Sequence, residues 1–218
     1  MGLHQVMTNQ TSVYLLGCDA TMSTAVEALL DTTGLDVHIS RTPLDFLNSI
    51  DENAHGCLIL DVRLPKMGGL QVLSELKRRH SDLAVIFLTN CQDITVAIDA
   101  LKRGAFEYIT MPYSEQKLLD SIYDAVDRSQ KRFQKSSLIR EIQTRMQTLT
   151  KREEQILDCI AAGKINKVIS TELNISSKTV EMHRANVMRK MQASNLAELI
   201  TTYAFYKFSL ADIAVGSV

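Results

Sequence analysis

The sequence has 218 residues, of which 45% are hydrophobic and 22% charged, an ordinary composition for a soluble globular protein of one large or two small domains. No apolar run approaches the roughly 20 residues that a membrane-spanning helix needs, so we expect no membrane association. The start of the chain shows no secretory signal, and four cysteines at spacings that match no zinc pattern predict reduced thiols. We therefore expect a cytoplasmic protein without a metal or other cofactor.

Charge is distributed unevenly along the chain. Residues 1–130 carry 10 basic and 17 acidic side chains. Residues 131–148 carry 5 basic and 1 acidic, and residues 149–218 carry 9 basic and 7 acidic. An acidic front and a basic back indicate two modules with different partners.

The first 125 residues alternate between two kinds of segment. Apolar, β-branched runs predict strands at 13–17, 37–40, 57–61, 84–89 and 106–110. Helical patterns lie between them at 22–30, 44–50, 70–79 and 94–103, and a further helix begins at 115. This alternation predicts an α/β domain over residues 1–125, with a doubly wound, five-stranded parallel sheet covered on both faces.

Candidate functional residues of this domain follow the predicted strands. In parallel sheets, polar sites gather at the carboxyl ends of the strands. The residues at or just past those ends are Gly17, Cys18, Asp19, Asp61, Thr89 and Met111. Asp61, at the end of the buried run in "GCLILDVRLPKMGG", is interpreted as a phosphorylation site, a metal ligand or the remnant of a lost site.

Residues 126–148 form a predicted helical linker. The pattern predicts a helix over 114–148 with a break near Ser136–Ser137. The linker is either simply solvated or a connecting helix that transmits the geometry of a dimer.

Residues 149–218 show helical patterns alone. Thr150 and Glu153 fit a capping box, Gly163 ends the first helix, and Asn166 is expected to cap the second. Asn174 stands where a turn needs left-handed dihedral angles, and Ser176 is expected to cap a third helix over 177–191. A fourth helix is expected from Asn195.

The third of these helices has two different faces. Val180, Val187 and Met191 form an apolar stripe, whereas Lys178, Met182, Ala185 and Arg189 form another, with Glu181 beside it. Short and charged side chains can lie flat in a major groove, and a helix, a short turn and a capped helix have the geometry of a helix-turn-helix reader. The alternative is an ordinary solvated helix face. In a reader, phosphate oxygens would be contacted by Arg184, Arg189, Lys190, Lys164 and Lys167.

The span 149–204 resembles the LuxR-type helix-turn-helix. The residues that carry the resemblance are L-T-x-R-E, Gly163, Asn166-Lys167, N-I-S, T-V-E-x-H and "RANVMRKM". The resemblance implies binding to double-stranded DNA, with base-reading positions at Glu181, Met182 and Ala185. It places Lys178, Thr179, His183 and Arg189 at or near the DNA backbone. The last helix, 195–205, is implied to pair two subunits, although packing inside the domain is an equal alternative.

The front of the chain resembles a response-regulator receiver domain, of flavodoxin-like fold with strand order 2-1-3-4-5. "LDVRLPKMGG", "FLTN" and "GAFEYITMPY" carry this resemblance, and the whole chain is similar to the NarL/FixJ group. A working receiver would use Asp61 to accept a phosphoryl group, Thr89 to bond it, two acids after the first strand to hold Mg²⁺, and a lysine before Pro112 to neutralise charge. Tyr108 matches the aromatic switch position.

The sequence departs from that pattern at the metal and at the cation. Gly17 and Cys18 stand where the acidic pair belongs, Asp19 is one residue late, and Met111 replaces the lysine. Because phosphoryl transfer rests on charge neutralisation, we expect a receiver that works without phosphorylation and Mg²⁺. Asp61 is then a structural acid that caps loop amides or bonds Thr89, and Met111 fills the vacated space.

Several alternatives remain for function and control. The protein is expected to be a homodimeric transcription regulator without enzymatic activity. The alternatives are a conventional two-component regulator phosphorylated on Asp61, and an interaction module that binds a sensor kinase or another protein. Constitutive dimerisation is favoured as the control, with a small ligand or a redox change at Cys18 and Cys91 as alternatives.

Overall fold

The computed structural model describes residues 12–17, 20–31 and 33–215, and for residues 20, 21 and 211–215 it describes the backbone alone. Cys18 and Asp19 therefore lie outside the described residues. By its internal contacts the chain divides into two compact units, residues 1–134 and residues 135–218. The boundary falls inside the segment 126–148 that the sequence assigns to a linker.

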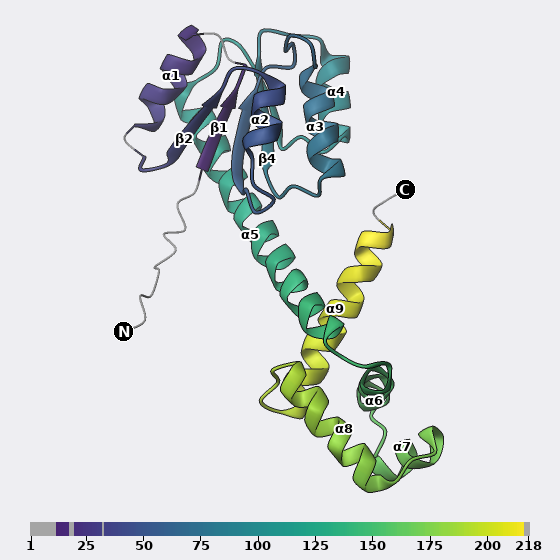
Figure 1. The fold of residues 1–218 in the computed structure, drawn as a ribbon. Coiled ribbons are helices and arrows are strands. Elements are labelled where there is room, and N and C mark those ends of the chain that lie inside the picture. The colour runs from purple at the N-terminus through teal and green to yellow at the C-terminus, as the bar shows by residue number, and fades with distance from the viewer. Residues whose placement is uncertain (1–11, 18–19, 32, 216–218) are drawn as a thin grey trace. The chain divides into compact units, whose positions relative to one another are not determined.

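A parallel sheet forms the centre of the first unit (Figure 1). Its strands are β1 (Ser12–Leu16), β2 (Asp36–Ser40), β3 (Gly56–Leu60), β4 (Ala84–Thr89) and β5 (Glu107–Thr110), in the order β2-β1-β3-β4-β5. This arrangement confirms the predicted fold class and strand order. Leu60 pairs with Leu16 on one side and with Phe87 on the other, which aligns the carboxyl ends of β1, β3 and β4.

Helices cover both faces of this sheet. The helix bounds are α1 (Ala20–Leu30), α2 (Pro43–Ser49), α3 (Gly69–Arg78), α4 (Ile94–Lys102) and α5 (Glu115–Gln147). Helices α2, α3 and α4 lie on one face, whereas α1 and the first part of α5 lie on the other (Figure 1). Every residue of β3 and β4 is buried, as expected for central strands enclosed on both sides.

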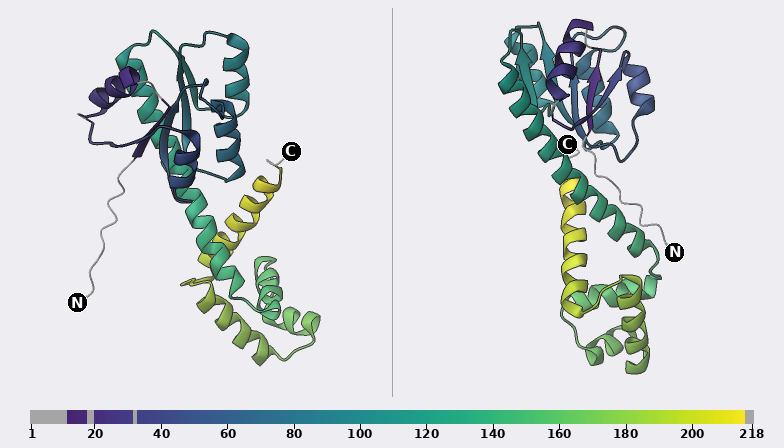
Figure 2. Two further views of the ribbon diagram at one scale, coloured as in Figure 1. Left: turned by 45° about the horizontal axis from the view of Figure 1, so that its top comes forward. Right: turned by 90° about the vertical axis from the view of Figure 1, so that its left-hand side faces the viewer.

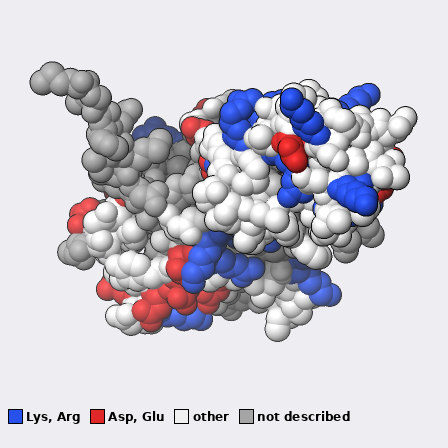
Figure 3. Space-filling view, turned by 90° about the horizontal axis from the view of Figure 1, so that it is seen from below, with Lys and Arg blue, Asp and Glu red and all other residues white. Residues whose placement is uncertain are grey.

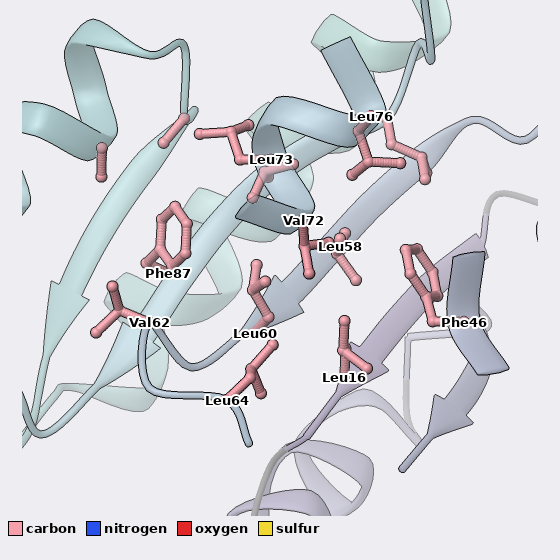
Figure 4. Close-up of a cluster of buried hydrophobic side chains, with 14 of the residues drawn as sticks. Leu16, Phe46, Leu58, Leu60, Val62, Leu64, Val72, Leu73, Leu76 and Phe87 are labelled. Carbon is pink, nitrogen blue, oxygen red and sulfur yellow. The ribbon is translucent and has the colours of Figure 1, made fainter. Parts of the chain in front are cut away.

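Two apolar cores result from this layering. Figure 4 shows the core between the sheet and α2–α4, in which Phe46, Leu60, Val72 and Phe87 meet. The second core joins alternate residues of the same strands, such as Val13 and Ile59, to α1 and α5. The carboxyl ends of the strands are therefore fixed from both faces.

Helix α5 runs without interruption from Glu115 to Gln147, so the predicted break near Ser136–Ser137 is wrong. Two serines cost a helix little, and their neighbours are mostly good helix formers. Within the first unit, the Ser129 hydroxyl donates to Asp82 O at 2.8 Å and accepts from Gly56 N at 2.7 Å. This buried hydroxyl joins α5 to the start of β3 and to the residues before β4.

The second unit contains the end of α5 together with α6 (Lys151–Ala161), α7 (Asn166–Leu173), α8 (Ser177–Lys190) and α9 (Leu196–Val215). Figure 2 shows these helices from two further sides. Their core combines Ile142 of α5 with Ile156, Ile169, Val187 and Leu199, all fully or almost fully buried.

Local signals account for most of the ends of these helices. Thr150 and Glu153 form the predicted capping box, Asn174 has φ 51° and ψ 52°, and Ser176 accepts from Thr179 N at 3.1 Å. Asn195 accepts from Glu198 N at 2.9 Å and thereby caps α9. Helix α9 reaches Val215, ten residues beyond the expected end.

The prediction that Asn166 caps α7 is wrong. Helix α7 begins at Asn166 itself, and Ile165 is the N-cap, without a side-chain hydrogen bond. After α6, the amide of Gly163 donates a hydrogen bond to Ile160 O, and the amide of Lys164 donates one to Cys159 O. Ile165 is extended, with φ −79° and ψ 156°, and Asn166 lies inside the first turn of α7.

Candidate functional sites

Asp61 and Thr89 meet at the carboxyl ends of β3 and β4. The Thr89 hydroxyl donates to Asp61 Oδ1 at 2.8 Å, and the backbone amide of Arg63 donates to the same oxygen at 2.7 Å. Cys91 N donates to the Thr89 hydroxyl at 3.2 Å. Asp61 therefore caps a loop amide and bonds Thr89, which are the two structural contacts expected from the sequence.

Tyr108 extends this network to β5. Its hydroxyl donates to Cys91 O at 3.0 Å, and its ring centroid lies 6.0 Å from that of Phe87. Burial, together with the neighbouring Cys91, raises the pKa of Tyr108, so the phenol stays protonated as a donor. Hydrogen bonds thus connect Asp61 to Tyr108 through Thr89 and Cys91.

Cys91 and Arg63 form a contact that the sequence did not predict. The Arg63 guanidinium lies 3.5 Å from Cys91 Sγ. Hydrogen bonds from the Asp93 amide and from Tyr108, with Arg63 beside them, lower the pKa of the buried Cys91 thiol. The position of Arg63, two residues after Asp61 in a turning loop, was the available signal. The alternative of a redox change at Cys18 and Cys91 is not tested, because Cys18 lies outside the described residues.

Gly17 follows β1 with φ +64°, and its amide donates to Ser40 O at 3.1 Å. A Cβ atom at this position would lie 2.1 Å from Leu64 Cδ2. Leu64 is itself buried and belongs to the core under α2–α4. The space that an acidic side chain at position 17 would enter is therefore occupied by a leucine.

Met111 follows β5 and is half-buried against the core between the sheet and α1 and α5. Its amide donates to Thr89 O at 3.0 Å, and its peptide bond to Pro112 is cis. An apolar thioether at this position supplies no positive charge to Asp61.

The described residues do not fit the Mg²⁺ site that the receiver resemblance implies. Mg²⁺ prefers an octahedral set of oxygen ligands. Gly17 and Cys18 contribute no carboxylate, one oxygen of Asp61 already accepts two hydrogen bonds, and Asp19 lies outside the described residues. No group of three or more His, Cys, Asp or Glu side chains suited to a metal occurs in the described part of the chain.

Helix α8 presents the second candidate site. Val180 and Val187 are completely buried on its inner side. The outer side exposes the predicted contact residues Lys178, Glu181, Met182, Ala185 and Arg189, whereas Thr179, His183 and Arg184 are half-buried. In Figure 3, which views the protein from the side of α7 and α8, Lys and Arg side chains are spread over a mostly uncharged surface.

The basic residues predicted to contact DNA fall into two groups. Four of them make no hydrogen bond or ion pair through their side chains to any described residue: Lys167, Lys178, Arg184 and Arg189. Lys164 instead pairs with Glu172 at 2.6 Å, and Lys190 pairs with Glu153 at 2.6 Å. A phosphate contact by either of these two lysines would have to replace an existing pair.

The Lys190–Glu153 pair holds α8 to α6 and was not predicted. Glu153 is 3% exposed, and Lys190 also donates to Thr148 O at 2.8 Å. Burial alone would raise the pKa of Glu153, but hydrogen bonds from Lys190 and Thr150 outweigh it and lower the pKa. Arg145 of α5 donates to Met191 O, the C-cap of α8, at 3.2 Å. The C-terminal end of α8 is thus fixed by two cations.

Among the described residues, no helix combines the length and the apolar character that crossing a membrane requires.

Comparison with known proteins matches both units. The family model of the luxR family of bacterial regulatory proteins matches residues 147–203, and that of the response regulator receiver domain matches residues 18–123. The response regulator protein TodT of Pseudomonas putida is 35% identical over 96% of this chain and 92% of its own length. The transcriptional regulatory protein FixJ of Bradyrhizobium diazoefficiens is 32% identical over 89% of this chain and 95% of its own length.

Solved structures agree with these relatives. The response regulator StyR has a TM-score of 0.81 at 31% identity and covers 90% of this chain and 100% of its own. Full-length FixJ from B. japonicum has a TM-score of 0.53 at 30% identity and covers 92% of this chain and 99% of its own.

Proposed function

Since this chain belongs to the response regulators that join a receiver domain to a LuxR-family DNA-binding domain, we propose that it is a homodimeric transcription regulator whose receiver works without a phosphoryl group and without Mg²⁺. It acts in the cytoplasm on double-stranded DNA. The phosphate-independent part of the proposal rests on a single observation, the hydrogen-bonded state of Asp61.

Asp61 already has partners for the oxygen that faces Thr89. In phosphoryl transfer, catalysis is mostly positioning and neutralisation of charge, to which the metal and a cation contribute. In this chain Gly17 stands where the receiver pattern has an acid, and Met111 stands where it has a lysine. Leu64 fills the space beside Gly17. A phosphoryl group on Asp61 would carry added negative charge into a site with little to balance it.

The hydrogen bonds supply another means of fixing the same loop. Thr89 and Tyr108 occupy the positions that the receiver resemblance assigns to the phosphoryl-sensing hydroxyl and the switch aromatic. Both are held by the path from Asp61 through Thr89 and Cys91 to Tyr108. We propose that this path keeps the β4–α4 loop in its DNA-competent conformation without modification.

An apolar stripe on α4 supports the homodimer. Ile94, Ile98 and Leu101 are 71%, 47% and 48% exposed and recur at spacings of four and three residues, which places them on one side of the helix. Clustered exposed apolar side chains favour association. We propose that this stripe meets its copy in a second chain.

On the DNA-binding unit, we propose that Lys167, Lys178, Arg184 and Arg189 contact phosphate oxygens. Their side chains make no ion pair within the described residues, so binding would not first break one. Such contacts release counterions and make the affinity dependent on salt.

The test uses DNA selected by the protein itself. Full-length protein, with and without acetyl phosphate and Mg²⁺, is used to enrich duplexes from a random library, and binding to the selected duplex is then measured by gel shift under both conditions. Asp61→Asn is the informative variant, because an amide oxygen can still accept from Thr89 and Arg63 but cannot be phosphorylated. Asp124→Ala, at an exposed acid on α5, is the control.

We expect wild type and Asp61→Asn to bind equally, with or without acetyl phosphate and Mg²⁺. Binding that requires both reagents and disappears in Asp61→Asn would establish the conventional phosphorylated regulator instead. Protein that enriches no duplex, yet captures a sensor kinase or another protein partner through residues 1–134, would favour the interaction module.

A further inference from the structure

We infer that α8 reads a half-site in which a cytosine is accompanied by thymines: Glu181 accepts a hydrogen bond from the cytosine amino group, while Met182 and Ala185 contact thymine methyl groups. This inference rests on the proposed DNA-binding function. It goes further by naming the bases that this particular helix recognises.

The outward face of α8 sets which side chains can reach a groove. Successive residues of an α-helix are about 100° apart, so Lys178, Glu181, Met182, Ala185 and Arg189 fall within an arc of about 100°. Val180 and Val187 lie on the opposite side and are completely buried. All five residues of the arc are exposed, and Met182 is 55% exposed.

Position along the helix separates base contacts from backbone contacts. In helix-turn-helix proteins, the N-terminal residues of the second helix contact the base edges. Glu181, Met182 and Ala185 lie in the first three turns of α8, whereas Arg189 lies immediately before its last residue. The resemblance to the LuxR-type helix-turn-helix implies Glu181, Met182 and Ala185 as the base-reading group, and Lys178 and Arg189 lie on either side of it along the helix.

Glu181 is the informative member of this group. Lys178 and Arg184 stand three residues before and after it, yet Glu181 pairs with neither, nor with any other described residue. A carboxylate facing DNA is repelled by the phosphates, and this repulsion is offset only where the carboxylate accepts a hydrogen bond from a base. In the major groove, the cytosine edge offers its N4 amino group, whereas adenine places the N7 acceptor beside its N6 donor. An acceptor-only carboxylate therefore favours cytosine.

Met182 and Ala185 have no side-chain donor or strong acceptor with which to read a polar base edge. The C5 methyl of thymine is the apolar group that the four bases present in the major groove. Methyl contact with Met182 and Ala185 therefore selects thymine at the positions that these side chains reach.

The test compares base preferences among variants of the full-length protein. Wild type, Glu181→Gln, Met182→Ala and the control Glu154→Gln are each used to select duplexes from one random library. Glu154 is an exposed acid on α6, outside the α8 face. Circular dichroism melting checks that each variant is folded.

We expect wild type and Glu154→Gln to enrich the same site, with cytosine at one position. Glu181→Gln should change that base to adenine, because an amide can pair with both N6 and N7, with a change in preference of about 5- to 100-fold. Replacing thymine by uracil in the wild-type site should weaken wild-type binding about fourfold per buried methyl, and should weaken binding of Met182→Ala less.

Three negative results have different meanings. If no variant enriches any duplex, the proposed DNA-binding function fails, and this inference fails with it. If all four enrich one site with unchanged bases, the chain binds DNA but Glu181 does not read it. Equal sensitivity of wild type and Met182→Ala to uracil would overturn the assignment of Met182.

Discussion

Leu64 lies so close to Gly17 that a Cβ atom on Gly17 would be 2.1 Å from Leu64 Cδ2. This contact explains in steric terms why the first strand is followed by a residue without a side chain. Restoring an acid at this position therefore requires more than one substitution.

Gly17→Ala is the simplest test of that contact. Its matched control is Gly34→Ala, because Gly34 has a similar φ of +72° but no other atom within 4 Å of the point that a Cβ would occupy. Both changes incur the cost of a left-handed residue, about 1–2 kcal/mol, and Gly17→Ala adds an overpacking cost of about 1–3 kcal/mol. Urea unfolding should show the difference, and equal losses would mean that Leu64 moves aside freely.

Thr89→Val removes the hydroxyl that bonds Asp61 while keeping the shape of the side chain. Thr89 is 1% exposed, and the change leaves Cys91 N without its acceptor. We expect a loss of about 1–3 kcal/mol in the free energy of unfolding, and weaker DNA binding by the unphosphorylated protein. Thr110→Val, at the exposed end of β5, should change neither. Unaltered DNA binding by folded Thr89→Val would contradict the proposed role of the Asp61–Thr89 bond.

Ser129→Ala tests the attachment of α5 to the sheet. The change leaves a buried amide of Gly56 without an acceptor and the carbonyl of Asp82 without this donor. We expect a loss of about 2–4 kcal/mol in the free energy of unfolding, measured with urea. Ser137→Ala, at an exposed position of the same helix, should be neutral or slightly stabilising. A neutral Ser129→Ala would show that the hydroxyl bridge contributes no stability.

Acid should weaken the DNA-binding unit through Glu153. The pKa of this carboxyl in the folded protein lies below its usual value of 4.5, so the unfolded chain binds the proton more tightly. The stability that Glu153 adds is therefore complete above the unfolded pKa and is lost as the pH falls through the folded pKa.

Glu153→Gln should consequently lower the melting temperature at neutral pH, because Lys190 loses its charged partner, and should flatten its dependence on pH below about 5. Circular dichroism melting across this range provides the measurement. The control is Glu154→Gln, at the exposed residue next to Glu153, whose melting temperature should depend on pH as that of wild type does. Parallel pH profiles for wild type and Glu153→Gln would be incompatible with this prediction.

Ile98→Glu tests the α4 stripe as a dimer surface. A charge placed among buried apolar side chains is costly, so the dissociation constant of the dimer should rise by about tenfold or more in sedimentation velocity. Leu44→Glu, on α2, replaces a leucine that is 65% exposed outside the stripe and should leave association unchanged. Equal behaviour of the two variants would place the dimer surface elsewhere.

The strands and most helices could be predicted because each depends on local patterns. The unbroken apolar runs of β3 and β4 indicate burial on both faces, and Thr150 and Ser176 are helix caps by their local chemistry. Asn166 failed as a cap because α7 begins at Asn166 itself, with Ile165 as the N-cap and no side-chain hydrogen bond.

The candidate sites were predictable as sets of positions but not as sets of contacts. The ends of parallel strands bring Asp61 and Thr89 together, and the expected hydrogen bond is present at 2.8 Å. The close approach of Leu64 to Gly17 and the ion pair between Lys190 and Glu153 depend on loops and helices that meet only in the folded chain. No periodicity in the sequence carries that information.

The core of the second unit has a practical consequence for cutting the chain. Ile142 is 1% exposed in that core, and Arg145 bonds the end of α8, although both residues precede the helix-turn-helix match at 147. A fragment excised at residue 149 would leave an apolar hole where α5 had been and would free the carbonyl of Met191. Excision near residue 135 retains both anchors, and should yield the fragment that withstands proteolysis better.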